Sequence, residues 1–534
     1  MQFNPLEKRF PSVRNPIYSN KGMVCTSQPL AAEAGAEILR KGGNAVDAAV
    51  ATAACLTVVE PTSNGIGGDA FAIVWMKEQM YGLNASGPSP ESISIDKVKN
   101  MGYEEMPKYG VVPITVPGAP KAWSSLISKF GKLTLEEVLA PAVRIAREGY
   151  PVSPTLGKSW GKAVKSYSIQ QDSIFKEWMK VFTREGRAPK IGDVVTLPDH
   201  ADTLELIGQT DAEAFYKGAL ADKIDETSKK YGGYIRKSDL ENFEPTWVKP
   251  ISINYKGYDV WEIPPNGQGI IALMGLNIMK ALPKKLFGTV DFYHQQFEAM
   301  KLAFSDGLHY ITDPEHMGIT SSSLLSEEYG KKRASLIGDQ AIEPEVGEPL
   351  KSGTVYLATA DNEGNMVSYI QSNYMGFGSG VVIPGTGIAM QNRGHTFKLD
   401  KNHVNALEPN KRTYHTIIPG FITKNDKAIG PFGVMGGFMQ PQGHMQVISN
   451  MIDYKMNPQD ALDAPRWQWV KGKTFSVEAS LNHDVVRQLS LKGHLVQMTP
   501  EVGSFGRGQI ILKTENGVYV GGTESRTDGY IAIL

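Results

Sequence analysis

The order of hydrophobic and polar positions along the chain predicts helices and strands that alternate without a regular period. Residues 29–41 have helical periodicity and stop at Gly42 and Gly43, which is typical of a helix C-terminus. Asn44 suits the N-cap of a second helix, rich in alanine, that we expect to continue to about Val58. Because alanine side chains are small, this composition predicts close packing between the helices.

The rest of the chain follows the same irregular alternation. A glycine-rich turn at 60–69 leads into a predicted strand at 70–76, so it lacks the strand-to-helix setting of a nucleotide-binding loop. Residues 120–250 are predicted to be mostly helical, and residues 251–265 are predicted to form one strand. Further helices are expected at 290–310, near 440–454 and near 458–463. This pattern favours stacked layers of sheet and helix.

The composition describes an ordinary globular protein. The chain has 534 residues, of which 41% are hydrophobic and 21% charged, with a formal net charge of −1. A charge so close to zero gives no bulk attraction to nucleic acid, and no apolar run of about 18 residues predicts a membrane helix. Cys25 and Cys55 lie in apolar stretches and indicate no disulfide framework. Residues 1–9 lack a signal-like apolar core, so we expect a cytoplasmic protein without nucleic-acid or membrane partners.

The segment from Ser352 to Asn365 contains the residue on which the functional prediction depends. An acidic, proline-containing stretch at 343–351 predicts an exposed loop, and an apolar strand follows Thr354. Cleavage of the Gly353–Thr354 bond would place a free α-amine beside the threonine hydroxyl. One residue would then supply both the nucleophile and its base. Threonine is also favoured in strands, so this segment alone fits equally a threonine that only begins a strand.

Other catalytic patterns do not occur, whereas the C-terminal third contains small-residue sites suited to acyl transfer. The chain has no HExxH or G-x-S-x-G motif, and its ten histidines have no metal-ligand spacing, so we expect no metal and no cofactor. Gly436 and Gly437 end a predicted strand before a helix. Backbone N–H groups at such a point can stabilise an oxyanion, although a tight turn would use the same residues.

Polar residues at two further strand ends are candidates for positioning the nucleophile and the substrate. Ser372, Asn373 and Tyr374 follow a predicted strand, where their side chains either position the Thr354 amine or complete a turn. Arg393 lies at another strand end. Its guanidinium either holds a substrate carboxylate through paired hydrogen bonds or faces solvent.

Taken in order, these segments resemble the γ-glutamyltransferase family of N-terminal nucleophile hydrolases over nearly the whole chain. The matching segments are Lys41 to Ala49, Glu60 to Asp69, Val116 to Gly118, Pro264 to Gly269, Ala303 to Asp306, the Thr354 segment, Gly436 to Gly437, and Ala464 to Arg466. The resemblance implies an α+β fold, a four-layer αββα sandwich made as one inactive precursor. Autocleavage would give a large segment, 1–353, and a small segment, 354–534. The two segments would form one interleaved domain as a heterodimer. Whether two such heterodimers associate is left open.

The resemblance also implies roles for individual residues. Thr354 would attack an amide carbonyl of a small-molecule substrate and form an acyl-enzyme that water or an acceptor amine resolves. Gly436 and Gly437 match the oxyanion-hole glycines of the family. Ser372 matches a hydroxyl residue that contacts the amine of the nucleophile, while Asn373 and Tyr374 remain candidates for substrate binding.

Several positions depart from the pattern of enzymes that bind a γ-glutamyl group. Ser86 stands where those enzymes have an arginine for the α-carboxylate, and Thr396 stands where they have an aspartate for the α-amine. His415 and Thr416 replace a pair of serines that helps to hold the carboxylate, whereas Arg393 replaces a neutral amide. The residues for amide cleavage are therefore kept, and those for glutamyl binding are largely replaced. This pattern is closer to the γ-glutamyltransferase-like branch that includes oxamate amidohydrolase.

These observations predict a self-processing amidohydrolase or acyltransferase that acts on a small carboxylated amide. Two alternatives stay open. The first is a true γ-glutamyltransferase that uses glutathione as its donor. The second is an unprocessed member of the family without catalytic activity.

Overall fold

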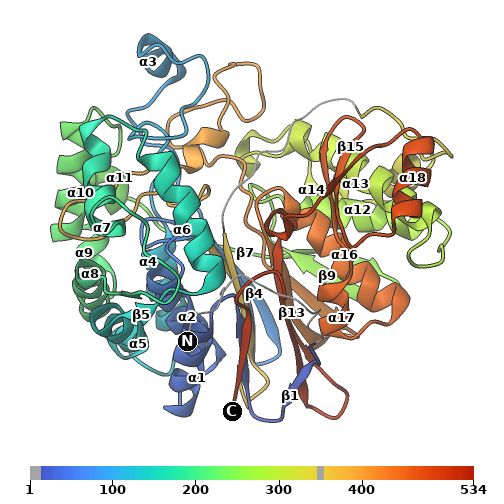
Figure 1. The fold of residues 1–534 in the computed structure, drawn as a ribbon, viewed down its shortest axis with the longest axis horizontal. Helices are drawn as coiled ribbons and strands as arrows, with labels where there is room; N and C mark the ends of the chain where they lie inside the picture. Colours follow the sequence, from blue (N-terminus) through green and yellow to red (C-terminus); the bar gives the residue numbers. More distant parts are fainter. Residues whose placement is uncertain (1–13, 345–353) are drawn as a thin grey trace.

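Two antiparallel sheets face each other at the centre of the molecule, with helices on both outer sides (Figure 1). The computed structural model describes residues 14–344 and 354–534, so the loop predicted to precede Thr354 lies largely outside the described residues. Within this part of the chain each large sheet has seven strands. The first sheet has the order β19 (Tyr530–Ile533), β2 (Met23–Thr26), β10 (Val355–Ala360), β11 (Met366–Ser372), β3 (Asp69–Met76), β4 (Gln79–Ala85) and β7 (Thr246–Val248). The second has the order β1 (Ile17–Ser19), β18 (Tyr519–Thr523), β17 (Arg507–Lys513), β13 (Lys427–Met435), β12 (Gly420–Lys424), β9 (Tyr258–Glu262) and β8 (Ile251–Tyr255).

Each sheet has its own helical layer, which completes the four layers that the sequence predicted. Helices α1 (Pro29–Arg40), α2 (Ala45–Val59) and α4 (Ala119–Phe130) pack on the first sheet, and α5 (Leu135–Glu148) packs behind α2. Helices α12 (Gly269–Ala281) and α16 (Met439–Tyr454) pack on the second sheet, with α13 (Val290–Tyr310) behind α12. Figure 1 shows these two helical groups on opposite sides of the sheets. The αββα prediction is therefore confirmed.

A hydrophobic core fills the space between the two sheets. It includes Phe71, Tyr356 and Ile370 from the first sheet, and Phe421 and Ile511 from the second. Every second side chain of a strand points to the same face, so one face of each sheet supplies this core while the other packs against helices. The strand that follows Thr354 thus lies in the most protected part of the molecule.

Helices α1 and α2 form as the sequence predicts. The Asn44 side chain accepts from the N–H groups of Val46 and Asp47, and the Asp47 carboxylate accepts from the Asn44 N–H, which makes a capping box. All residues of α2 are buried. A Cβ on Gly35 of α1 would lie 2.3 Å from Thr52 Oγ1 of α2, so small residues allow the close approach of the two helices.

The segment 251–265 differs from its prediction, because it forms a hairpin rather than one strand. Strands β8 and β9 pair antiparallel around Lys256 and Gly257, which have φ values of 53° and 89°. Positive φ at two successive residues is typical of a tight hairpin turn, and the Lys-Gly pair was the local signal for it.

The remaining described elements complete the outer layers and two small sheets. On the side of the first sheet they are α3 (Ile95–Asn100), β5 (Tyr150–Pro151), α6 (Pro154–Tyr167), α7 (Lys176–Phe182), β6 (Val194–Val195), α8 (Pro198–Gln209), α9 (Glu213–Tyr216), α10 (Ala219–Lys230) and α11 (Lys237–Glu241). On the other side they are α14 (Ser321–Leu324), α15 (Glu327–Ala334), α17 (Pro458–Asp463), β14 (Trp467–Lys471), β15 (Thr474–Glu478), α18 (His483–Leu491) and β16 (Leu495–Thr499). Among the described helices, none combines the length and apolar character needed to cross a bilayer.

Candidate active site

A buried threonine at the start of a central strand forms the centre of the candidate site. Thr354 directly precedes β10 and has no exposed surface. Its Oγ1 donates to Oγ of Ser372 over 3.2 Å. Ser372 is the last residue of β11, which pairs antiparallel with β10. Strand pairing therefore brings together two hydroxyl residues that the sequence analysis had selected separately.

The turn after β11 is shaped by close contact with the glycine-rich turn that precedes β3. A Cβ on Gly68 would lie 2.6 Å from the Ser372 carbonyl oxygen and 2.7 Å from Asn373 Oδ1, so only glycine fits there without a shift. Tyr374 has a left-handed backbone, with φ of 73°, and its N–H donates to Ser372 Oγ over 2.8 Å. Asn373 and Tyr374 are fully buried, so this turn is part of the site's interior.

Arg393 is completely buried, and the structure does not place it on the surface. Its Nη1 donates to Thr416 Oγ1 over 2.7 Å, and its guanidinium carbon lies 4.4 Å from the centroid of the Tyr374 ring. The Nε and Nη2 atoms of Arg393 and the Tyr374 hydroxyl have no hydrogen-bond partner among the described residues. Burial lowers the pKa of Arg393 to about 10, against the opposing effect of Asp69, so the guanidinium remains charged at neutral pH.

Asp69 and His415 form a buried pair beside this arginine. Oδ2 of Asp69 lies 2.9 Å from Nε2 of His415. Nδ1 of His415 accepts from the Ile417 N–H over 3.4 Å, so the neutral ring carries its proton on Nε2 and donates it to Asp69. Oδ1 of Asp69 accepts from Gln391 Nε2 over 2.9 Å and from the Gly87 N–H over 3.3 Å. Every donor that contacts Asp69 is thus uncharged.

Burial determines the protonation of this pair. It lowers the pKa of His415 well below its ordinary value, and the nearby Arg393 charge acts in the same direction. Burial raises the pKa of Asp69 to about 7, although Arg393 and the donors to its carboxylate oppose that shift. The pair therefore carries at most one negative charge at neutral pH, next to the positive charge of Arg393.

The predicted oxyanion glycines join the same set of contacts. Gly436 and Gly437 follow β13 with φ values of 139° and 62°, a region that favours glycine. Gln268 Nε2 donates to the Gly437 carbonyl over 2.8 Å and to the Thr416 carbonyl over 2.6 Å. Tyr414 fixes this amide by donating its hydroxyl to Gln268 Oε1 over 2.8 Å. Thr416 in turn contacts Arg393, so the glycine turn and the arginine are coupled through two side chains.

Ser86 and Thr396, the two departures from the glutamyl-binding pattern, are both used inside the protein. Ser86 Oγ donates to Asn84 Oδ1 over 2.7 Å. Thr396 Oγ1 donates to the Arg393 carbonyl over 2.8 Å and lies 2.7 Å from Thr413 Oγ1. Neither residue brings a charge to the site.

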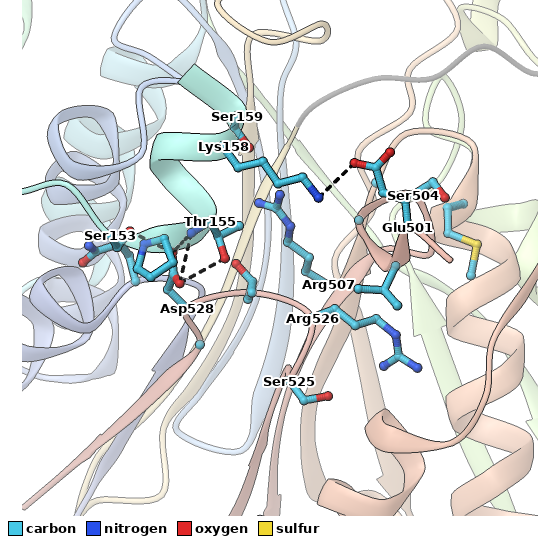
Figure 2. A pocket seen from close by; sticks show the side chains of 18 of the residues that line it. Ser153, Thr155, Lys158, Ser159, Glu501, Ser504, Arg507, Ser525, Arg526 and Asp528 are labelled. Atoms are coloured by element: carbon cyan, nitrogen blue, oxygen red, sulfur yellow. Dashed lines mark hydrogen bonds and ion pairs between the residues drawn. The ribbon is translucent and has the colours of Figure 1, made fainter. Parts of the chain in front are cut away.

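A cavity of about 1250 Å³ opens beside the glycine turn. Its lining includes Gly436, Phe438 and Met439 from the segment after β13, and Met375 and Gly376 from the turn after β11. The side chains drawn in Figure 2 include Ser153, Thr155, Lys158 and Ser159 from α6 and its N-cap, and Glu501, Ser504, Arg507 and Asp528 from the C-terminal segment. Some of its charged groups have partners within the protein: Asp528 accepts from Ser153 Oγ over 2.7 Å, and Lys158 lies 3.2 Å from Glu501.

A second buried cluster lies away from this site. His294, Glu298 and His494 form the one group of three potential metal ligands found among the described residues. Lys301 Nζ lies 2.6 Å from Glu298 Oε1. A cation of the protein therefore already neutralises the only carboxylate of this cluster, which makes it a poor match to a metal site.

No role for Asp69 or Gln268 follows from the sequence pattern alone. Each is a polar residue that ends or interrupts a glycine-rich segment, which was the only local signal. Their partners in the site, His415 and Thr416, lie 346 and 148 positions further along the chain. Contacts of that separation are formed by the fold and leave no periodic pattern.

Two facing sheets between helical layers, with a threonine leading a central strand, define the class of N-terminal nucleophile hydrolases. Comparison with known families agrees with this class. The sequence profile of the family described as Gamma-glutamyltranspeptidase matches residues 31–534, and the chain belongs to this family.

Individual relatives are similar over almost the whole chain. The glutathione hydrolase-like YwrD proenzyme of Bacillus subtilis is 38% identical and covers 96% of this chain and 98% of its own. The oxamate amidohydrolase proenzyme of Klebsiella pneumoniae is 31% identical over the same shares of the two chains, 96% and 98%. The crystal structure of cephalosporin acylase from Bacillus halodurans is 57% identical, with a TM-score of 0.97, and covers 100% of this chain and 99% of that one.

These similarities confirm the predicted family and the predicted class of enzyme. The protein is an amidohydrolase or acyltransferase of the γ-glutamyltransferase type. Both curated relatives carry the designation proenzyme, which agrees with the predicted precursor. The names of the relatives refer to different substrates, so they do not identify the substrate of this chain.

Proposed function

We propose that this protein cleaves itself before Thr354 and then hydrolyses amides of a carboxylate-bearing acyl group through a Thr354 acyl-enzyme. The observation that carries the proposal is the buried Thr354 hydroxyl, hydrogen-bonded to Ser372 at the start of a core strand. Within this family, such a residue gains a free α-amine only by cleavage of the bond that precedes it. Gly353 lies outside the described residues, so the bond itself is assigned from the sequence.

The chemistry follows from the groups around Thr354. An α-amine has an unperturbed pKa of about 7.7–8.0, so it can accept the hydroxyl proton at neutral pH. Thr354 Oγ1 then attacks the amide carbonyl, and the N–H groups of the Gly436–Gly437 turn stabilise the oxyanion. Collapse of this intermediate expels the amine, which takes the proton from the α-ammonium, and leaves an ester on Thr354. Water attacks that ester and releases the acid.

Arg393 supports the carboxylate in the proposed substrate. A fully buried guanidinium with two nitrogens that have no partner among the described residues matches a carboxylate, which accepts two parallel hydrogen bonds. Gly436 also lines the large cavity, which we propose takes the departing amine. We propose that the two fragments stay together as a heterodimer, because each of the two large sheets contains strands from both.

The experiment is to stop the reaction with a substrate anilide in acid within milliseconds to seconds and to measure intact masses. The proposal expects the fragment that begins at Thr354 to gain the mass of the acyl group, and the large fragment to gain nothing. The Thr354→Ala protein serves as control and should release no chromophore. Steady turnover by Thr354→Ala would overturn the proposal.

The alternative function is hydrolysis of glutathione or transfer of its γ-glutamyl group. The relative of Bacillus subtilis named glutathione hydrolase-like is the observation in its favour. A γ-glutamyl anilide, assayed with and without glycylglycine, separates the two functions. Stimulation of chromophore release by glycylglycine would favour the transferase, whereas a flat trace beside an active carboxyacyl anilide would exclude it.

A further inference from the structure

The family-like segment Ala464 to Arg466 ends in a fully buried arginine that has no part in the site described so far. Arg466 Nη1 donates to two successive carbonyls, those of Phe505 and Gly506, over 3.0 and 3.1 Å. These two residues directly precede β17. A guanidinium suits such a task, because its N–H groups are fixed in one plane. Arg466 therefore holds the chain at the point where it enters β17.

Glu524 completes this contact, and we call the pair of Arg466 and Glu524 the clamp. Glu524 Oε2 lies 2.8 Å from Arg466 Nη2 and accepts from the Gly508 N–H over 2.8 Å. Burial acts to raise the pKa of Glu524, but Arg466 and Arg526 outweigh it and lower that pKa to about 2. The clamp therefore stays charged at neutral pH. Buried ion pairs are weak evidence for stability, so the geometry that this pair imposes on the chain is the more informative property.

The stretch that the clamp holds lies directly against the glycine turn of the candidate site. A Cβ on Gly436 would lie 3.1 Å from Gly506 Cα, and a Cβ on Gly506 would lie 2.8 Å from the Met435 carbonyl oxygen. Ser504 and Arg507, on either side of this stretch, line the large cavity (Figure 2). The clamp thus reaches the glycine turn through a single layer of backbone.

A turn made of glycine takes its geometry from its surroundings. Gly436 and Gly437 have φ values of 139° and 62°, and glycine restricts its own backbone less than any other residue does. An N–H group that stabilises an oxyanion must be placed accurately, since a shift of about 1 Å can cost about 100-fold in rate. On the side of β17 the neighbour of this turn is Gly506, whose carbonyl Arg466 holds.

We infer that Arg466, acting with Glu524, is a positioning residue for the reaction of Thr354. The clamp holds Gly506 against Gly436 and so fixes the N–H groups that are proposed to stabilise the oxyanion. This inference rests on the proposed function, because the oxyanion forms only in that reaction. Its kinetic consequence is specific. Donors to an oxyanion act in the transition state, so loss of the clamp should lower kcat and leave KM nearly unchanged.

The double variant Arg466→Met/Glu524→Gln tests this inference. It removes one positive and one negative charge together, and the new amide can still accept from the Gly508 N–H, so the fold is spared an unpaired buried charge. With glutaryl p-nitroanilide as substrate, we expect kcat to fall about 10- to 100-fold and KM to change by less than about twofold. An unchanged kcat, or a loss confined to KM, would overturn the inference.

Two single variants separate positioning from a general loss of stability. Gly506→Ala pushes on the Met435 carbonyl from within the same contacts, so it should lower kcat and spare KM in the same way. Arg333→Met is the matched control, because Arg333 Nε lies 3.0 Å from Asp306 Oδ2 in a largely buried pair between α13 and α15. It should lower the melting temperature and keep kcat. An equal fall of kcat in Arg333→Met would show that destabilisation alone explains the effect.

A tetrahedral analogue measures the oxyanion contact directly. 4-Boronobutanoic acid gains a bond from boron to Thr354 Oγ1, the hydroxyl proton passes to the α-amine, and the boron becomes tetrahedral and negatively charged. Its inhibition constant should rise in the double variant by about the factor by which kcat falls. Equal inhibition of the two proteins would contradict the positioning role.

All rates are divided by the amount of free Thr354 N-terminus, measured by intact mass. A variant that does not cleave itself is made by co-expressing residues 1–353 with residues 354–534 behind an initiator methionine, which cells remove before threonine. If the wild type neither hydrolyses the anilide nor binds the boronic acid, the proposed function fails and the inference fails with it. If the wild type does both and the double variant equals it, the inference alone fails.

Discussion

At the scale of single residues, the site depends on buried polar groups that hold one another through hydrogen bonds. Ser372 joins two of them, because its Oγ accepts from Thr354 Oγ1 and from the Tyr374 N–H. It thereby couples the orientation of the Thr354 hydroxyl to the turn that carries the Tyr374 ring.

Replacement of Ser372 tests this coupling. We expect Ser372→Ala to lower kcat of the processed enzyme about tenfold, because the Thr354 hydroxyl loses a contact that orients it. The unpaired Tyr374 N–H should also cost about 1–3 kcal/mol of stability. Kinetics normalised to the free Thr354 terminus and a thermal melt measure the two effects. Ser372→Thr keeps the hydroxyl and should recover most of kcat; an unchanged kcat in Ser372→Ala would contradict the coupling.

Asp69 gives the fold a predictable dependence on pH. Burial raises the pKa of Asp69 to about 7 in the folded protein, whereas an unfolded aspartate has a pKa of about 3.9. The folded state therefore binds the Asp69 proton more tightly than the unfolded state does. The stabilisation from this proton is complete below about pH 4 and is lost as the pH rises through about 7. Ionised Asp69 should lower stability at pH 8.

The variant Asp69→Asn removes this titration. The free energy of unfolding of Asp69→Asn minus that of wild type should rise by on the order of 2–4 kcal/mol as the pH goes from 5 to 8. Denaturant unfolding of both proteins at the two pH values measures this difference. If the difference in free energy of unfolding between the two proteins is the same at both pH values, Asp69 keeps an ordinary pKa in the folded protein.

At the scale of elements, the approach of two turns builds the site. The glycine-rich turn before β3 lies against the turn after β11, and Gly68 leaves the room that Ser372 and Asn373 occupy. A methyl group at this point would push the Ser372 carbonyl, and with it the hydroxyl that contacts Thr354. The spacing of these turns is therefore part of the geometry of the candidate site.

Two glycine substitutions with different surroundings test the role of this spacing. Gly68→Ala should destabilise the protein by about 1–3 kcal/mol and lower activity, because backbone atoms cannot move aside freely. Gly161→Ala is the matched control: it lies in α6 with no atom within 4 Å of the added Cβ, and alanine should stabilise a helix there by up to about 1 kcal/mol. Thermal melts and turnover measure both; equal behaviour of the two variants would argue against a special role of the turn.

The sequence predicted the elements with strong local signals and missed those that depend on distant contacts. The helices around Asn44 and at 290–310 were predicted nearly to their ends, because caps and periodicity are local properties. The hairpin at 251–262 was read as one strand, since both of its strands are similarly apolar. Gly436, Gly437 and Ser372 were selected through their motifs, and the structure places Ser372 against Thr354. The hydrogen bond between Asp69 and His415 could not be predicted from the sequence, because it forms between β3 and a loop far along the chain.

At the scale of the whole molecule, the segments before and after Thr354 are built into the same two sheets. Strand β10 lies between β2 and β11 in the first sheet, and β12 and β13 lie between β9 and β17 in the second. One segment cannot leave without breaking backbone hydrogen bonds of central strands. We therefore expect a single cooperative melting transition after cleavage, with both fragments eluting together under native conditions.

If Thr354 becomes an N-terminal nucleophile, a measurement of intact mass under denaturing conditions will reveal the new terminus. Wild type and Thr354→Ala are produced side by side and measured without substrate. The account predicts two wild-type fragments, the second beginning at Thr354, and one uncut chain for Thr354→Ala. A single uncut wild-type chain, or cleavage at another bond, would contradict the account, because Thr354 would then never gain its amine.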